Sequence, residues 1–300
     1  MSEVSRIRFH GLDALHLQAS DGASAIVTCH GAHVVSWIPA DGDERLYLSE
    51  QSAMQEGAPI RGGIPVIFPQ FATYGPLPHH GFARTRIWMW RLAETEPIGK
   101  EAGVRLRLED SPETYDLWPH RFAAELSVGI DNHRLKVQLL IENTDRVPFD
   151  FTAALHTYLR VLDVRLVRLD GLQGTRFRDR TRSDCESEDT AEAITIAEEV
   201  DRIYLDAPDT LRLREPNRSL GLHAEGFPEV VVWNPWITKC ALLPDMPDQG
   251  YLNMLCVEAA AVARPIRLEA GERWIGTQVL DGGAFELTSP HSIDRTGAPG

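Results

Sequence analysis

The chain has 300 residues, 43% hydrophobic and 25% charged, which is the ordinary composition of a globular protein that can bury a large core. Its formal net charge of −14 argues against nucleic acid and anionic membranes as partners, because an acidic surface repels both. A few arginines gathered in a cleft can still hold an anionic small molecule on such a protein.

The N-terminal region and the cysteines indicate the compartment. Residues 1–15 contain no apolar h-region, and no segment of the chain is apolar enough to span a membrane. The cysteines, Cys29, Cys185, Cys240 and Cys256, show neither C-x-x-C spacing nor the His/Cys spacing of a zinc site. All except Cys185 lie in or beside apolar runs, as reduced buried thiols do. We therefore expect a cytoplasmic protein in a reducing compartment.

Two segments in the first third of the chain combine glycine, proline and charge. RGGIPVIFPQF, at residues 61–71, is compatible with a plain strand after a turn, or with a close backbone approach at its double glycine. LPHHGFAR, at residues 77–84, places two histidines and an arginine in a polar loop. Binding residues concentrate in such loops, although a solvated loop with an arginine ion pair is the alternative.

Short strands and turns dominate the rest of the chain. Residues 104–108 alternate apolar and charged side chains with period two. Residues 122–130 and 134–143 flank a turn-forming Asp-Asn pair, which predicts a β-hairpin. Further strands are expected at residues 153–161, 230–233, 254–261 and 274–280, and the best helix candidate is at residues 190–200.

Many short strands with few short helices predict an all-β fold, a large antiparallel β-sandwich of two sheets. We expect a single domain over residues 1–288, followed by a loose C-terminal tail at residues 289–300 that mixes Ser, Pro, Gly and charge. A division of the chain near Ala102 is the alternative.

His156 lies in the predicted strand FTAALHTYLR, residues 151–160. Alternate residues of a strand share a face, so His156 lies on the more polar of the two faces. That face contains Thr152, Ala154, Tyr158 and Arg160, and the other contains Phe151, Ala153, Leu155 and Leu159. A satisfied structural histidine is the common outcome, but imidazole also serves as acid or base near neutral pH.

A single carboxylate interrupts the apolar run MLCVEAAAV at residues 254–262. Glutamate is almost never fully buried unless it is paired, because removing a carboxylate from water is costly. Glu258 therefore indicates a functional group, with a structural ion pair to an arginine as the alternative.

These segments together resemble the aldose 1-epimerase superfamily, and most closely its hexose-6-phosphate mutarotases (glucose-6-phosphate 1-epimerases). Besides the segments quoted above, the resemblance includes GAHVVSW at residues 31–37, DRIY at 201–204, VVWNPW at 231–236 and GERW at 271–274. Each motif alone is weak, but their common order along nearly the whole chain is specific. The resemblance implies an antiparallel β-sandwich of the galactose-mutarotase type.

The resemblance also implies the functional residues. The catalytic pair corresponds to His156 and Glu258, and the implied substrate-binding residues are Arg61, Arg84 and Asp201, with His80 near the site. Family members commonly have Gln where this chain has His79. A neutral imidazole can donate and accept hydrogen bonds, as an amide does, so His79 is kept as a candidate substrate contact.

The implied activity is interconversion of the α and β anomers of a hexose 6-phosphate, with glucose 6-phosphate as the expected substrate. Ring opening needs one base, for which Glu258 is suited, and one acid, for which His156 is suited. We therefore expect no metal and no cofactor. The expected partner is a small-molecule sugar phosphate, with no nucleic acid and no membrane, and the chain is expected to be a monomer.

Three other functions are compatible with parts of the sequence. A mutarotase for neutral aldoses is disfavoured by Arg61 and Arg84, which suggest an anionic substrate group. A non-catalytic carbohydrate-binding or sensor protein on the same fold is disfavoured because binding alone needs no acid and base. A lyase or glycosidase would need a second carboxylate or another base, and no paired-carboxylate motif is present.

Overall fold

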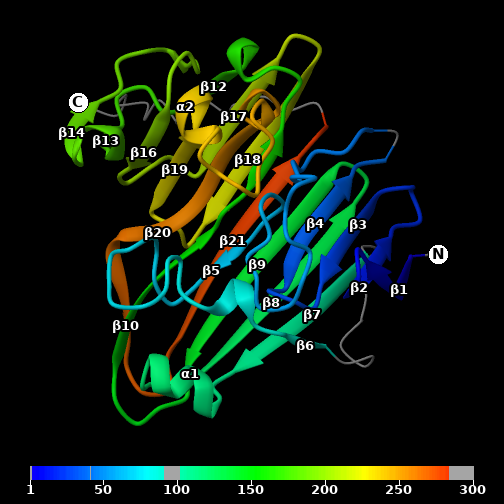
Figure 1. Ribbon diagram of the computed structural model, residues 1–300, viewed down its shortest axis with the longest axis vertical. Coiled ribbons are helices and arrows are strands. Elements are labelled where there is room, and N and C mark those ends of the chain that lie inside the picture. The colour runs from blue at the N-terminus through cyan, green and yellow to red at the C-terminus, as the bar shows by residue number, and fades with distance from the viewer. Residues whose placement is uncertain (1, 41, 91–101, 284–300) are drawn as a thin grey trace, which may run out of the picture.

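In the computed structural model, residues 2–40, 42–90 and 102–283 are described, and they form antiparallel sheets joined by loops (Figure 1). The predicted hairpin is confirmed, because β8 (Phe122–Asp131) pairs with β9 (Arg134–Asn143) across a tight turn. Asn132 in that turn has a φ of 32°, in the left-handed region that Asn tolerates better than most residues. The all-β sandwich prediction is also confirmed.

Among the described residues, the largest sheet has nine strands, in the order β15-β12-β17-β18-β21-β9-β8-β7-β6. Its strands besides the hairpin are β15 (Ala193–Ile194), β12 (Arg168–Asp170), β17 (Thr210–Glu215), β18 (Arg218–Glu225), β21 (Arg273–Asp281), β7 (Ala102–Glu109) and β6 (Met89–Trp90). The strands predicted at residues 104–108 and 274–280 are therefore present.

A second sheet has eight strands, in the order β14-β13-β16-β19-β20-β10-β5, and β11 pairs with β20 as well. Its strands are β14 (Cys185–Glu188), β13 (Arg176–Asp179), β16 (Val200–Tyr204), β19 (Glu229–Asn234), β20 (Met254–Leu268), β10 (Phe149–Leu155), β5 (Val66–Ile67) and β11 (Tyr158–Arg160). The strands predicted at residues 230–233 and 254–261 correspond to β19 and β20. Four N-terminal strands form a further antiparallel sheet: β1 (Glu3–Phe9), β2 (Leu12–Gln18), β3 (Ser24–Thr28) and β4 (His33–Ile38).

Helices are short in the described part of the chain. They are the α-helices α1 (Pro112–Leu117) and α2 (Trp236–Cys240) and the 3-10 turns η1 (Ala83–Thr85), η3 (Val164–Leu166), η4 (Arg180–Arg182) and η5 (Gly250–Asn253). The helix predicted at residues 190–200 is wrong, because β15 pairs there with β12 and β16 begins at Val200. Pairing with neighbouring strands overrides the weak local pattern. Within residues 2–40, 42–90 and 102–283, no helix has the length and apolarity needed to cross a membrane.

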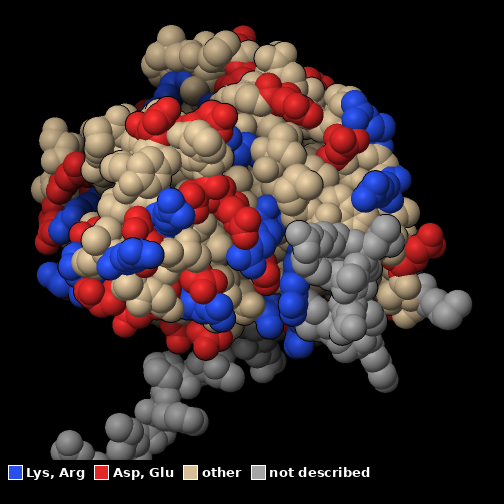
Figure 2. Space-filling model, turned by 90° about the horizontal axis from the view of Figure 1, so that it is seen from below, with Lys and Arg blue, Asp and Glu red and all other residues tan. Residues whose placement is uncertain are grey.

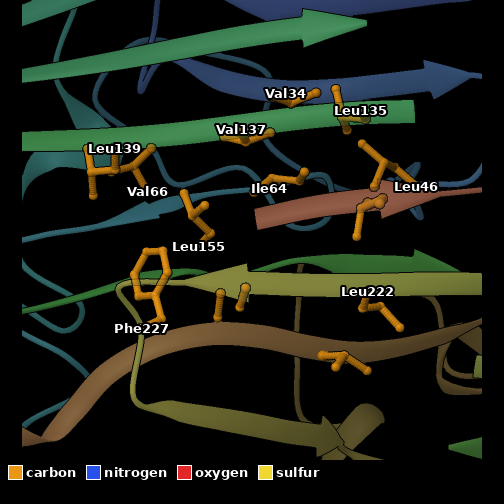
Figure 3. Packing of buried hydrophobic residues seen from close by; sticks show 14 of the residues in the cluster. Val34, Leu46, Ile64, Val66, Leu135, Val137, Leu139, Leu155, Leu222 and Phe227 are labelled. Carbon is orange, nitrogen blue, oxygen red and sulfur yellow. The ribbon is translucent and has the colours of Figure 1, made fainter. Parts of the chain in front are cut away.

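One large buried cluster lies between the sheets. Figure 3 shows some of its side chains, from β4, β5, β9, β10 and β18 and from the loops beside them. The cluster draws on strands on both sides of residues 91–101, and β6 pairs with β7 across that gap. We therefore propose that the described residues form one domain, with no division near Ala102. The tail predicted at residues 289–300 lies outside the described residues.

Successive side chains of β20 point alternately into this core and toward the opposite face of the second sheet. Leu255, Val257, Ala259 and Ala261 belong to the large cluster. The residues between them, Cys256, Glu258 and Ala260, therefore point to the other side of the sheet. The candidate site lies on that side.

Candidate active site

His156 and Glu258 face each other on neighbouring segments of the second sheet. Both β10 and β11 pair with β20 in one continuous register, in which Ala154 opposes Ala260 and Tyr158 opposes Cys256. That register brings His156 opposite Glu258, and Nε2 of His156 lies 3.3 Å from Oε1 of Glu258. The strand predicted at residues 153–161 is interrupted at His156, whose amide donates to the carbonyl of Pro65 at 3.0 Å.

Both side chains of this pair are buried without full hydrogen bonding. The exposed fraction is 9% for the side chain of His156 and 1% for that of Glu258. Nδ1 of His156 and Oε2 of Glu258 have no hydrogen-bond partner among the described protein atoms. A buried polar atom without a partner costs about 1–3 kcal/mol, so this is not a satisfied structural pair. The alternative of a Glu258–arginine ion pair is wrong, because the partner of Glu258 is a histidine.

The two groups have pKa values displaced in opposite directions. Burial raises the pKa of Glu258 well above its ordinary 4.5, and the nearby Asp201 adds to the effect. Burial lowers the pKa of His156 well below its ordinary 6.5, and Arg61 and Arg84 act in the same direction. A coupled acid and base with displaced pKa values is typical of proton-transfer sites.

The raised pKa of Glu258 gives a stability prediction. A carboxyl that holds its proton more tightly when folded makes folding less favourable as pH rises above about 4.5, because the unfolded chain releases that proton more readily. We expect Glu258→Gln to raise the free energy of unfolding by about 0.5–2 kcal/mol at pH 7 and by less at pH 4. Urea unfolding of both proteins at the two pH values measures this, and a Gln variant less stable than wild type at pH 7 contradicts it.

The double glycine positions Arg61 by close backbone approach, which is one of the two interpretations of this segment. Gly62 and Gly63 have φ of 112° and 61°, and a Cβ on either would lie 2.3 Å from a neighbouring carbonyl oxygen. His33 donates from Nε2 to the carbonyl of Gly62 at 2.7 Å. Ile64, next in the chain, is anchored in the core, as Figure 3 shows. Arg61 therefore projects from a rigid turn.

The two candidate arginines differ in their partners. Arg61 donates from Nε to Oδ2 of Asp245 at 3.1 Å and from Nη1 to the hydroxyl of Tyr158 at 3.0 Å. Arg84 donates from Nη2 to the carbonyl of His79 at 2.9 Å, and its Nε is buried without a partner among the residues that the structure describes. Burial lowers the pKa of Arg84 to about 10, and Arg61 acts in the same direction. Arg61 thus forms an ion pair, whereas Arg84, the loop arginine for which an ion pair was the alternative, forms none within the described residues.

Positive charge at this site is compatible with the acidic composition. The net charge of −14 does not give a uniform surface, because Figure 2 shows acidic and basic side chains interspersed over the face seen from below. Arg61 and Arg84 each lower the pKa of His156, and Arg61 donates to the hydroxyl of Tyr158, whose ring stacks on that of His156.

A backbone amide that precedes the loop at residues 77–84 fixes which ring nitrogen of His80 carries the proton. The amide of Ala72 donates to Nδ1 of His80 at 3.2 Å, so the neutral ring carries its proton on Nε2. Burial lowers the pKa of His80, and His156 acts in the same direction, which keeps the ring neutral. His80 is therefore suited to donate a hydrogen bond, with its ring centroid 5.5 Å from that of His156. The exposed His79 packs its ring on His80, with centroids 4.0 Å apart, and supplies its carbonyl to Arg84.

Asp201 lies on β16, in the same sheet. It is buried and accepts a hydrogen bond from Nη1 of Arg180 at 3.3 Å, and the ammonium of Lys239 lies 3.8 Å away. The adjacent Arg202 pairs elsewhere and lies 3.3 Å from Asp189. Burial raises the pKa of Asp201, and Arg180 and Lys239 oppose that rise.

Three further residues at the site were not predicted as functional. The ring of Tyr158 stacks on that of His156 with centroids 4.8 Å apart, and Trp233 meets His156 edge-on at 6.1 Å. Arg180 contacts Asp201 and lies over the ring of Phe71. The position of Tyr158, two residues after His156 in the predicted strand, was a usable signal. Arg180 lies in a 3-10 turn with no motif around it.

The side chains of His156, Cys256 and Glu258 converge at the centre of the site. One potential ligand atom from each lies within 4.8 Å of the other two, and all three residues are buried. Sequence spacing gave no sign of this group, because pairing of β10 and β11 with β20 brings together residues far apart in the chain. Cys29, Cys240 and Cys256 are free and buried, as predicted, and Cys185 is exposed.

The chain is similar in sequence and structure to known proteins. Residues 13–281 match the family described as aldose 1-epimerase. A protein of Cenchrus ciliaris named "Putative glucose-6-phosphate 1-epimerase" is 36% identical, over 90% of this chain and 84% of the relative. A protein of Escherichia coli with the same name is 34% identical, over 83% of this chain and 84% of the relative. A solved structure described as "a putative mutarotase (YeaD) from Salmonella typhimurium" superposes with a TM-score of 0.85 at 28% identity, covering 93% of this chain and 92% of the other.

Proposed function

The chain belongs to the aldose 1-epimerase family and is an isomerase of the mutarotase type, and we propose that it interconverts the α and β anomers of a hexose 6-phosphate, preferentially glucose 6-phosphate. The observation that carries this proposal is the buried pair of His156 and Glu258, 3.3 Å apart, near Arg84, which forms no ion pair among the described residues. The names of the two curated relatives support the same substrate class.

Mutarotation opens the sugar ring between C1 and the ring oxygen and closes it on the other face of C1. The anomeric hydroxyl must lose a proton while the ring oxygen gains one. Both oxygens are bonded to C1, so the two proton-transfer groups must be close neighbours, as Oε1 of Glu258 and Nε2 of His156 are. We assign Glu258 as the base at the anomeric hydroxyl and His156 as the acid at the ring oxygen, with the roles reversed on closure.

A phosphate on the substrate would also favour the protonated form of His156, which the assignment of His156 as the acid requires. The acid form of His156 is opposed by burial and by the charges of Arg61 and Arg84. A phosphate dianion held by those arginines would offset their charge and raise the pKa of His156 in the complex. The substrate group that the arginines bind therefore favours the imidazolium–carboxylate pair that starts ring opening. His80, as a fixed donor, and Asp201, as an acceptor, are suited to sugar hydroxyls.

Exchange spectroscopy tests the proposed function directly. NMR magnetisation transfer between the α and β anomers of glucose 6-phosphate should speed up with enzyme concentration, and the gain for glucose should be smaller. Exchange no faster than that in buffer, for both sugars, would exclude mutarotation.

We further propose that the enzyme acts as a monomer in the cytoplasm and needs no metal or cofactor.

Asp201 gives a prediction about substrate binding. We expect Asp201→Asn to raise KM about 10- to 100-fold, because removing the charge from a hydrogen bond to a substrate hydroxyl costs about 1.5–3 kcal/mol. The thermal midpoint should change little, since Arg180 and Lys239 each retain solvent contact. Steady-state kinetics and a melting curve measure the two effects.

Asp189→Asn is the matched control for Asp201→Asn. Both aspartates are 7% exposed, and each lies 3.3 Å from an arginine, but Asp189 pairs with Arg202. The Asp189 variant should lose stability, because Asp189 also accepts hydrogen bonds from the buried Tyr204 hydroxyl at 3.0 Å and from the amide of Ala191, and it should keep its KM. A destabilised Asp201 variant with unchanged KM would assign Asp201 to the same structural role.

A further inference from the structure

The group formed by His156, Cys256 and Glu258 has a chemistry that proton transfer does not use. The mechanism above employs the imidazole and the carboxylate, whereas the thiol of Cys256 has no step in it. Yet one donor atom of each side chain lies within 4.8 Å of the other two. An imidazole nitrogen, a thiolate and a carboxylate oxygen are all ligands that Zn²⁺ accepts.

The geometry fits a small tetrahedral cation. Zinc bonds of about 2.0–2.3 Å place neighbouring ligand atoms roughly 3.3–3.8 Å apart. The separation of 3.3 Å between Nε2 of His156 and Oε1 of Glu258 already meets this, and the remaining atoms need to approach by about 1.5 Å at most. Cys256 and Glu258 share one face of β20, and Cys256 opposes Tyr158 on β11, so the donors come from paired segments of one sheet.

The charges around the group limit how tightly it can hold a cation. Arg61 and Arg84 lie near His156 and repel a positive ion. Burial and Glu258 hold the thiol of Cys256 in its protonated form by raising its pKa. A bound Zn²⁺ would be neutralised by one thiolate and one carboxylate, and any proton held by the thiol or by the carboxyl group would be released to solvent. These features favour a reversible inhibitory site over a permanent structural one.

We propose that His156, Cys256 and Glu258 bind Zn²⁺ or a cation of similar softness, and that bound metal inhibits the enzyme by occupying its acid and base. The inhibition, though not the metal binding, rests on the function proposed above. Thiolate ligation discriminates against Mg²⁺ and Ca²⁺, which prefer oxygen ligands, so neither should bind here. Zinc would compete with substrate, because both need the same two side chains.

Cobalt absorption tests the binding without any assay of activity. Enzyme freed of metal with EDTA and dialysed is titrated with Co²⁺, which adopts similar geometry and gives a near-ultraviolet charge-transfer band when a thiolate is bound. We expect one equivalent to produce the band in wild type and in Cys240→Ser, which removes a buried thiol outside the group. Cys256→Ser and Cys256→Ala should lack the band, with folding checked by circular dichroism.

Zinc inhibition is then measured as the anomer-exchange rate of each variant relative to its own metal-free rate. We expect Zn²⁺ to stop exchange in wild type, EDTA to restore it, and Cys256→Ser to need at least about tenfold more Zn²⁺ for half inhibition. An unchanged cobalt band in the folded Cys256 variants, or none in wild type, overturns the proposal. Metal-free enzyme that becomes active only with added metal overturns the inhibitory role. A cobalt band in a protein without mutarotase activity would retain the metal site and reject the proposed function.

Discussion

Replacing Glu258 by Gln or His156 by Asn should each lower the rate of anomer exchange at least about 100-fold, because each positioned proton transfer contributes about 10²–10⁴-fold. Gln keeps the size and shape of glutamate, and Asn keeps a polar side chain in place of the imidazole, so the effect reports the lost proton chemistry. The double variant should be scarcely slower than either single one, since the two groups act on one coordinated proton movement. Magnetisation transfer between the anomers of glucose 6-phosphate measures all three rates.

Glu229→Gln is the matched control for the glutamate. Glu229 lies on β19 and is also fully buried, but its carboxylate accepts a hydrogen bond from the amide of Val262 at 2.7 Å. A Gln oxygen can accept the same bond, so this variant should exchange anomers at a near-native rate. Near-native exchange in Glu258→Gln would remove Glu258 from the mechanism, and the same result for His156→Asn would remove the histidine.

The stability of these variants separates function from folding. The folded chain tolerates Glu258 despite the cost of burial and although Oε2 has no partner among the described atoms, so its replacement should not unfold the protein. An inactive Gln variant that is at least as stable as wild type would show a residue retained for chemistry at the expense of stability. An inactive variant that is also unfolded would say nothing about catalysis, which is why unfolding is measured on the same samples.

The sequence predicted the individual strands better than it predicted which strands pair with each other. Period-two alternation in residues 104–108 and the Asp-Asn turn at residues 131–132 identified β7 and the β8–β9 hairpin, because both signals are local. The helix expected at residues 190–200 failed because β15 is stabilised by pairing with β12, which lies earlier in the chain. Such pairing depends on contacts that no local window contains.

The candidate site shows the same limit. Glu258 was identifiable because a carboxylate in an apolar strand is costly to bury unless it is paired or has a function. The structure confirms that Glu258 is buried. Cys256 gave no such signal, since its proximity to His156 arises from the register of β10 and β11 on β20. Arg180 could not be found at all, because a single arginine in a turn is the usual occupant of a solvated surface.

Removing the charge of Arg84 should lower kcat/KM for glucose 6-phosphate about 10- to 100-fold and leave residual turnover of free glucose almost unchanged. The partnerless Nε of Arg84 and its lack of an ion pair among the described residues make it the better candidate for an anion than Arg61, which Asp245 already neutralises. A guanidinium can grip phosphate oxygens with two parallel hydrogen bonds. Kinetics of Arg84→Gln on both sugars measures the difference.

Arg86→Gln is the matched control for Arg84→Gln. Arg86 is also half buried, and its Nε has no partner in the described part of the chain, but it lines a separate cavity with Ser111 and Glu113. Its replacement should leave kcat/KM unchanged for both glucose 6-phosphate and glucose.

Added salt should weaken the turnover of glucose 6-phosphate by wild type more than that of glucose, because salt screens the charge contact with the phosphate. This difference between the two sugars should shrink in Arg84→Gln.

Arg61 should behave differently because its partner remains behind. Arg61→Gln leaves the carboxylate of Asp245 without its cation, so an incoming phosphate loses one attraction and meets one repulsion. We expect a larger loss on glucose 6-phosphate than for Arg84→Gln, and partial recovery in the double variant Arg61→Gln/Asp245→Asn. Asp245→Asn alone should lower KM for the phosphorylated sugar. If each arginine variant loses activity equally on glucose and glucose 6-phosphate, the arginines do not bind the substrate phosphate, and the enzyme acts on neutral aldoses.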